Sequence, residues 1–222
     1  MDTAVALVEA YLRVNGYFTV TEYPVLEASA ALDEAHAVSD LDVLAFRFSG
    51  AGQSFTLRKH AALVGDLHGR IDPALGCPLD QADMIVGEVK RGRARFNAAT
   101  RQPEVLAFAL RRFGCCTQEA ALPVAHRLLS HGTASTPHGH VVRMVAFGGQ
   151  TMENPAPGWH VVPLAAMTAF LQQHLEAHWD VLRHVHFSSE VLDVLALLQR
   201  AKIVPGSFSN TASAQIGPAT PS

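Results

Sequence analysis

Glu88 and Lys90 place a carboxylate and an ammonium two positions apart, directly after the apolar run 84–86. Apolar and β-branched residues that end in a Gly-containing basic segment are typical of a short buried strand. Because strand side chains alternate, Glu88 and Lys90 project from one face and Val89 from the other. Charges at the end of a buried strand are costly without partners, so this pair requires an explanation.

A second acidic position precedes this strand in the chain. Residues 38–48 form the clearest predicted strand, and Asp40 and Asp42 project from one of its faces. A carboxylate on each of two adjacent strands can hold Mg²⁺ or Mn²⁺, which keeps several waters and accepts phosphate oxygens. The Val89 carbonyl is a candidate third ligand, and Lys90 would position or deprotonate a water. This set of groups predicts hydrolysis of a phosphodiester bond.

Arginines follow the Glu88 strand closely and suggest where a nucleic-acid backbone would lie. The formal net charge of −3 gives no overall basic field, so nucleic-acid binding requires a local patch. The candidates for phosphate contacts are Arg91, Arg93, Arg95 and Arg101. The alternative is a solvated loop in a chain whose basic residues are mostly arginine.

Apolar spacing and capping residues predict the elements that must position these groups. The first predicted element is a helix over 3–15, with Glu9 at the edge of its apolar stripe. A strand over 17–26, a loop or short helical turn over 29–37, and strands at 38–48 and 84–90 follow. The rest of the chain is predicted to form helices over 103–113 and 119–131, strands over 140–148 and 159–163, and helices over 164–182 and 190–202. Gly148-Gly149 is interpreted as a turn.

This alternation predicts an α/β (α+β) fold with a central mixed sheet flanked by helices. The 222 residues, 49% of them hydrophobic, suit one globular core over 1–150 with an insertion at about 49–83. Residues 151–204 are predicted to form a helical extension packed on that core. The tail over 205–222 is rich in Ser, Thr, Pro, Gly and Ala and is predicted to be disordered.

The order of these elements resembles that of the PD-(D/E)XK nuclease-like superfamily, also called restriction-endonuclease-like, over roughly residues 3–148. Asp42 corresponds to its first acidic position, Glu88 and Lys90 to its E-x-K, and Glu9 to the acidic residue that many members carry on the first helix. The resemblance implies a Mg²⁺- or Mn²⁺-dependent nuclease, with DNA as the expected substrate. No proline precedes Asp42, and about forty residues separate it from Glu88, which departs from the family pattern.

The choice of Asp42 over the secondary candidate Asp40 rests on this resemblance, because both face the same way. The plain alternative is a structural Glu88–Lys90 ion pair at a strand end. A second functional class stays open, in which an inactive nuclease-fold protein serves as a nucleic-acid or protein binding module.

Two other motifs indicate metal chemistry on their own. Gly65-Asp66-Leu67-His68-Gly69 looks like the first metal motif of calcineurin-like phosphoesterases, but the further blocks of that family are missing. His174 and His178 lie one helical turn apart, a spacing that can bind zinc, but their glutamate is misplaced for H-E-x-x-H and the favoured interpretation is that they flank a packed helix face.

Cysteine usage and hydropathy predict the compartment. The three cysteines include the adjacent pair Cys115 and Cys116, so no disulfide framework is expected and a reducing cytoplasm is predicted. No apolar run is long enough to span a membrane. The leucine-rich C-terminal helices, which carry Trp179, either form a homodimer interface or belong to the core.

Overall fold

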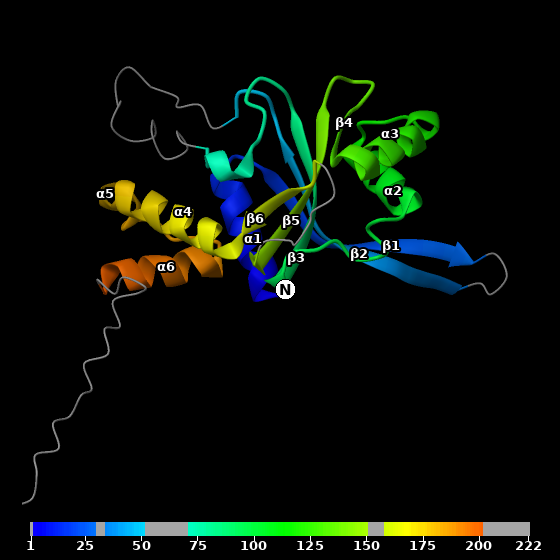
Figure 1. Cartoon of the computed structure of the whole chain (residues 1–222). Coiled ribbons are helices and arrows are strands. Elements are labelled where there is room, and N and C mark those ends of the chain that lie inside the picture. The colour runs from blue at the N-terminus through cyan, green and yellow to red at the C-terminus, as the bar shows by residue number, and fades with distance from the viewer. Residues whose placement is uncertain (1, 30–33, 52–70, 151–157, 202–222) are drawn as a thin grey trace, which may run out of the picture.

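One mixed sheet of six strands forms the centre of the protein, in the order β1-β2-β3-β5-β4 with β6 paired to β5. The computed structural model describes residues 2–29, 34–51, 71–150 and 158–201 (Figure 1). The strands are β1 (Phe18–Ser29), β2 (Glu34–Arg47), β3 (Asp83–Arg93), β4 (Thr133–Ser135), β5 (Val141–Gln150) and β6 (His160–Pro163). β1, β2 and β3 are successively antiparallel, whereas β3 runs parallel to β5, and β5 to β6.

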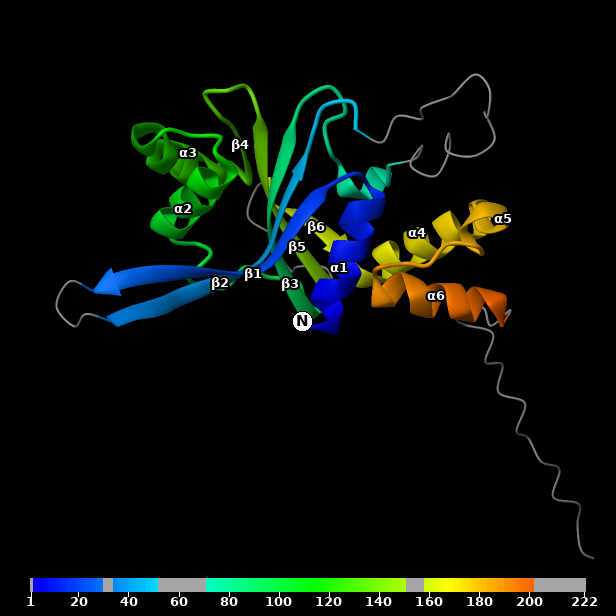
Figure 2. The ribbon, with the colours of Figure 1, turned by 180° about the vertical axis from the view of Figure 1, so that it is seen from behind.

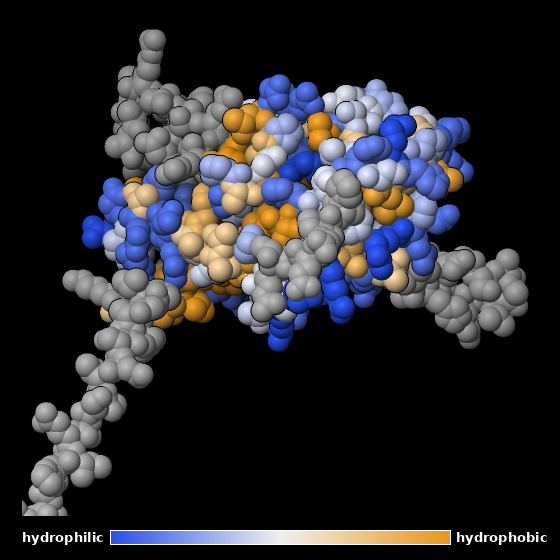
Figure 3. All heavy atoms as spheres, in the orientation of Figure 1, coloured by the Kyte–Doolittle hydropathy of each residue, from blue (hydrophilic) through white to orange (hydrophobic). Residues whose placement is uncertain are grey.

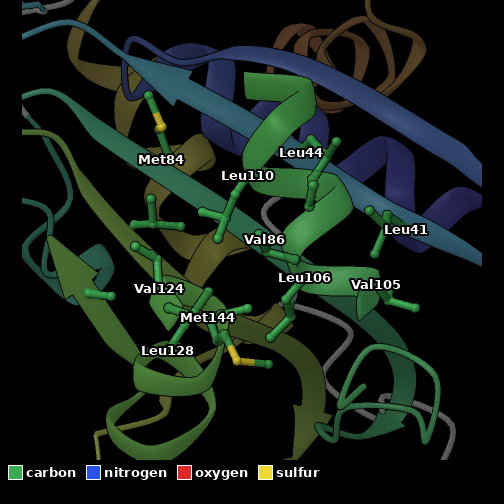
Figure 4. Packing of buried hydrophobic residues seen from close by; sticks show 14 of the residues in the cluster. Leu41, Leu44, Met84, Val86, Val105, Leu106, Leu110, Val124, Leu128 and Met144 are labelled. Carbon is green, nitrogen blue, oxygen red and sulfur yellow. The ribbon is translucent and has the colours of Figure 1, made fainter. Parts of the chain in front are cut away.

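Helices cover both faces of this sheet (Figures 1 and 2). They are α1 (Thr3–Val14), α2 (Pro103–Phe113), α3 (Gln118–His131), α4 (Leu164–Ala177), α5 (Trp179–Leu182) and α6 (Glu190–Arg200), with a short 3-10 turn, η1 (Pro73–Leu75). α1 and α4 bury apolar residues against one face, and α6 packs beside them. α2 and α3 bury theirs against the other face (Figure 4).

β3 separates the two cores because its side chains alternate between them. Met84 and Val86 pack with α2 and α3, whereas Ile85 and Val89 pack with α1 and α4. A strand covered on both faces reads as a continuous apolar run, which explains the sequence of β3. The acidic side chains of β3, Asp83 and Glu88, therefore point into the two helix-covered layers.

β2 leaves β3 partway along the sheet. The last pair between them joins Val43 to Gly87, yet β2 stays paired with β1 along the whole hairpin, which projects beyond the rest of the sheet (Figure 1). Leu41 and Val43 belong to opposite cores although they are two residues apart, so the hairpin twists between them. Across from that point Glu22 adopts a left-handed φ of 53°, which marks the same twist in β1.

β3 continues beside β5 to the pair Arg93–Gln150 after β2 has left. The chain then folds back closely over β5, where a Cβ added at Gly148 would lie 2.6 Å from the backbone of Ala94. Only glycine permits this approach. Gly148-Gly149 therefore belongs to strand β5, and the interpretation as a turn was wrong.

The predicted α/β class, with a mixed central sheet flanked by helices, is confirmed. The loop or helical turn predicted over 29–37 was wrong in part, because β1 runs to Ser29 and β2 begins at Glu34. The helix predicted over 164–182 is divided at His178, and β4 was not predicted.

The strand predicted over 159–163 is present as β6, so the region predicted as a helical extension also contributes to the sheet. β6 pairs with β5, and α4 buries Met167 and Leu171 in the core beside α1. The tail over 205–222 and most of the predicted insertion lie outside the described residues. Among the helices that the structure describes, none combines the length and apolar character needed to cross a membrane.

Candidate active site

Asp42, Glu88 and Lys90 meet where β2 separates from β3. Asp42 precedes Val43 and Glu88 follows Gly87, so the two acids lie across from each other on neighbouring strands. The Lys90 Nζ lies 2.6 Å from Glu88 Oε1 and 3.6 Å from Asp42 Oδ2. One ammonium therefore contacts both carboxylates on the same side of the sheet.

Asp42 also replaces a backbone partner that β3 has lost. Its Oδ2 accepts a hydrogen bond from the Val89 N–H at 2.7 Å, just beyond the last backbone pair between the two strands. The N–H and C=O of one strand residue face the same edge, so the Val89 carbonyl also faces this gap. Two carboxylates and a carbonyl oxygen thus surround the point of divergence.

Glu88 is 1% exposed and is held on both oxygens. Asn97 Nδ2 donates to its Oε1 at 2.9 Å, and Thr100 Oγ1 donates to its Oε2 at 2.7 Å. Asn97 Oδ1 in turn accepts from the Thr100 backbone N–H at 2.6 Å, which fixes the loop between β3 and α2. Hydrogen bonds to the ionised form let a carboxylate stay charged inside the protein.

Asn97 and Thr100 are site residues that the sequence analysis missed. Their only local signal is Asn97-Ala-Ala-Thr100 ahead of Pro103, the type of segment in which an Asn side chain closes a turn. That signal predicts a turn and says nothing of Glu88. The contact arises because the chain crosses back over β5 at Gly148.

The electrostatics of the site keep Lys90 charged. Partial burial lowers the pKa of Lys90, but its hydrogen bond to Glu88 and the charges of Glu88 and Asp42 outweigh that effect, so the net shift is upward. Lys90 is therefore an ammonium at neutral pH. In this arrangement its ammonium donates to Glu88 and lies beside Asp42.

The structure places Glu9 on the other face of the sheet, on α1. Its Oε1 accepts from Thr19 Oγ1 at 3.3 Å and lies 3.6 Å from Arg13 Nε. It lines a groove of about 890 Å³ between α1 and α6, together with Ser188 and Glu190. The structure does not join Glu9 to the Asp42–Glu88 gap, because α1 covers the face toward which Val89 points.

The four candidate arginines do not form one cluster around Glu88. Arg91 points to the α1 side and pairs with Asp2 at 2.8 Å, so it lies away from Glu88. Arg95 and Arg101 are exposed and flank the segment that carries Asn97 and Thr100. The remaining residues of the prediction, Arg93 and Asp40, are also exposed, and each has an interaction within the protein.

The described residues contain no larger set of metal-ligating side chains than the two carboxylates of this site. That part of the chain holds no cluster of three or more His, Cys, Asp or Glu side chains placed for a metal, so a metal here would rely on two carboxylates and a carbonyl. The His174 and His178 rings lie 4.8 Å apart on α4 without such a cluster. The Gly65–Gly69 motif lies outside the described residues.

The chain matches no protein-family model, no curated protein and no solved structure. What it does must therefore be inferred from the site itself.

Proposed function

We propose that this protein is a metal-dependent nuclease with a restriction-endonuclease-like core, which hydrolyses phosphodiester bonds in nucleic acid, DNA being the expected substrate. The observation that carries the proposal is the meeting of Asp42, Glu88 and Lys90 at one gap between two strands. The sequence of α1, three antiparallel strands, a helical crossover and the parallel strand β5 supports it.

The residues around the gap fit a magnesium or manganese ion. Both ions prefer oxygen ligands, and Asp42, Glu88 and the Val89 carbonyl supply them without any sulfur or imidazole. A bound ion would supply Lewis-acid stabilisation of the charge that develops on the phosphate. The hydrogen bonds from Asn97 and Thr100 would hold Glu88 in place, since outer partners orient ligating carboxylates.

Lys90 acts on the water that attacks the phosphate. Its raised pKa keeps it protonated, so it orients that water by donating a hydrogen bond and stabilises negative charge in the transition state. The proton that the water loses passes to another acceptor, such as a phosphate oxygen or solvent. This refines the sequence-based alternative in which Lys90 removes the proton itself.

One observation favours the second candidate, a nucleic-acid binding module that has lost catalysis. Glu88 already has a partner on both oxygens, and Lys90 already contacts both acids. A site of this kind is stable without a metal. The same assay distinguishes the two functions.

The test incubates purified protein with single- and double-stranded DNA and RNA, in Mn²⁺, in Mg²⁺ and in chelator. The enzyme predicts cleavage that chelator stops and that Asp42→Asn with Glu88→Gln abolishes. Salt-dependent binding without cleavage supports the binding module instead. If neither binding nor cleavage occurs on any nucleic acid, the proposed function is wrong.

Metal binding is measured separately from turnover. An ion that binds only the folded protein stabilises it by about 2.7 kcal/mol at a concentration one hundred times its dissociation constant. We expect the thermal shift with Mn²⁺ to disappear in the Asp42→Asn, Glu88→Gln protein. A shift that survives would place the metal elsewhere, with Asp66 and His68 as the first residues to change.

A further inference from the structure

An aromatic and basic stack lies on α2 where it meets the base of the β1–β2 hairpin. The rings of Tyr23 and Phe108 have centroids 6.0 Å apart and are tilted by 32°, and the Arg112 guanidinium lies 5.2 Å from the Tyr23 centroid. Phe108 and Arg112 are four residues apart and so share one face of α2. Phe108 remains 37% exposed, which leaves part of an aromatic surface open to solvent.

This stack lies close to the candidate active site. Tyr23 pairs with Leu41, the residue before Asp42. α2 begins directly after the loop that carries Asn97 and Thr100, both of which contact Glu88. The open ring and the acidic gap therefore face the same side of the sheet.

Exposed arginines lie along the chain between Glu88 and this stack and on α2 itself. They are Arg95, Arg101, Arg111 and Arg112, and the exposed acids nearby in the chain are Glu104 on α2 and Glu22 and Asp40 on the β1–β2 hairpin. The α2–α3 side in Figure 3 shows mostly hydrophilic residues with a few apolar ones among them. This pattern is complementary to a polyanion that also carries flat apolar groups.

We propose that this surface binds single-stranded nucleic acid, with one base stacked on Phe108 and the backbone following Arg95, Arg101 and Arg112 toward the gap. The inference rests on the proposed function in taking nucleic acid as the substrate. Aromatic side chains beside a basic track are the usual means of holding single strands, because every unpaired base has an open π face. In a duplex these faces are covered by neighbouring bases, so Phe108 would gain nothing from it.

The experiment measures binding without cleavage. Full-length protein carrying Glu88→Gln is titrated in chelator against labelled single-stranded DNA, single-stranded RNA and duplex DNA, with fluorescence anisotropy as the readout. We expect single strands to bind more tightly than the duplex. Phe108→Ala should weaken single-strand binding about tenfold and leave duplex binding unchanged, since one stacked base contributes about 1–3 kcal/mol.

Three variants make the test specific. Phe108→Leu keeps an apolar contact with Tyr23 but loses the aromatic face, and should weaken single-strand binding while the protein stays folded. Phe108→Trp should restore binding. Leu122→Ala removes an exposed apolar side chain from α3, 41% exposed, and should have no effect.

Two results would overturn the proposal. One is equal affinity for single strands and duplex; the other is unchanged single-strand binding in both Phe108→Ala and Phe108→Leu. Its failure is distinguishable from failure of the proposed function. If the protein cleaves duplex in a metal-dependent way and shows no preference for single strands, only the single-strand binding surface is rejected. If binding depends on Phe108 but the wild-type protein never cleaves, only the nuclease function is rejected.

Discussion

β3 carries two charged clusters, one at its start and one at its middle, and they face opposite sides of the sheet. At its start, Asp83 receives two bonds from Arg143, at 2.8 Å and 2.7 Å, and one from the Tyr17 hydroxyl at 2.5 Å. At its middle, Glu88 contacts Lys90, Asn97 and Thr100. Asp83 and Glu88 are both fully buried, so burial of the acid does not distinguish the clusters.

The two clusters differ in how far their cations are exposed to solvent. Arg143 is 9% exposed and also donates to the Leu75 carbonyl at 2.9 Å, so its bidentate pair with Asp83 is closed to solvent. Lys90 is 31% exposed, and it lies at a gap where one strand has left the sheet. The Asp83–Arg143 pair is closed to solvent and fully bonded, whereas the Glu88–Lys90 pair is partly open to solvent and lies beside a second carboxylate, Asp42.

The largest expected effect concerns Lys90. Lys90→Ala should lower turnover by about 10²–10⁴-fold, because the water and the transition state lose a positioned donor. The free energy of unfolding should fall by less than in Arg143→Met, because Asn97 and Thr100 still donate hydrogen bonds to the buried Glu88 carboxylate. Cleavage assays and urea unfolding of the same preparation measure both. A loss of several kcal/mol with turnover unchanged would place Lys90 in the structural class, beside Arg143.

Arg143→Met should show the opposite behaviour. It leaves the buried Asp83 without its cation, so the free energy of unfolding should fall by about 3–5 kcal/mol. Cleavage per folded molecule should stay unchanged. The double variant Arg143→Met with Asp83→Leu removes both charges and should recover most of the lost stability. If the single variant is as stable as wild type in urea, the two clusters do not differ as described.

Thr100→Val tests whether Thr100 orients Glu88 for metal binding or only supports the fold. It removes a hydrogen bond to a buried carboxylate, which is expected to cost about 1.5–3 kcal/mol of stability. The apparent affinity for Mn²⁺ should fall by about 10–100-fold, because the ligand loses its orienting partner. Thr100→Ser keeps the hydroxyl and should restore the affinity, measured by metal titration of cleavage and of thermal stability. Equal Mn²⁺ affinity in Thr100→Val and wild type would show that Thr100 supports only the fold.

The smallest expected effect is a loss of stability at alkaline pH, caused by Tyr17, whose hydroxyl donates to Asp83. Burial, followed by the charge and hydrogen bond of Asp83, raises the pKa of Tyr17. Above pH of about 10 the unfolded chain loses this proton while the folded protein keeps it, so stability is complete below that pH and falls as pH rises. Tyr17→Phe should flatten this fall in urea unfolding.

Tyr11 provides a parallel control for that experiment. Its pKa is raised by burial and by its hydrogen bond to Asp72, at 2.8 Å, so Tyr11→Phe should remove a second part of the same slope. An alkaline loss that is identical in wild type and Tyr17→Phe would contradict the assignment of Tyr17.

The sequence by itself determined the elements and the alternation along them. The apolar run of β3 fixes which side chains share a face, so alternation alone assigns Glu88 and Lys90 to one side of the strand. Helix α2 could be predicted between Pro103 and Gly114 because both ends carry their usual residues. These are local properties, which depend on neighbours in the chain.

Tertiary structure decided which distant residues meet. β1 and β2 twist at Glu22 and Leu41, which opens the gap beside Glu88; no local signal predicts a twist shared by two strands. The close crossing at Gly148 delivers Asn97 and Thr100 to Glu88, and α1 packs on the far face and carries Glu9 away. Each outcome depends on how layers pack, a property of pairs of elements that the sequence of either element alone does not contain.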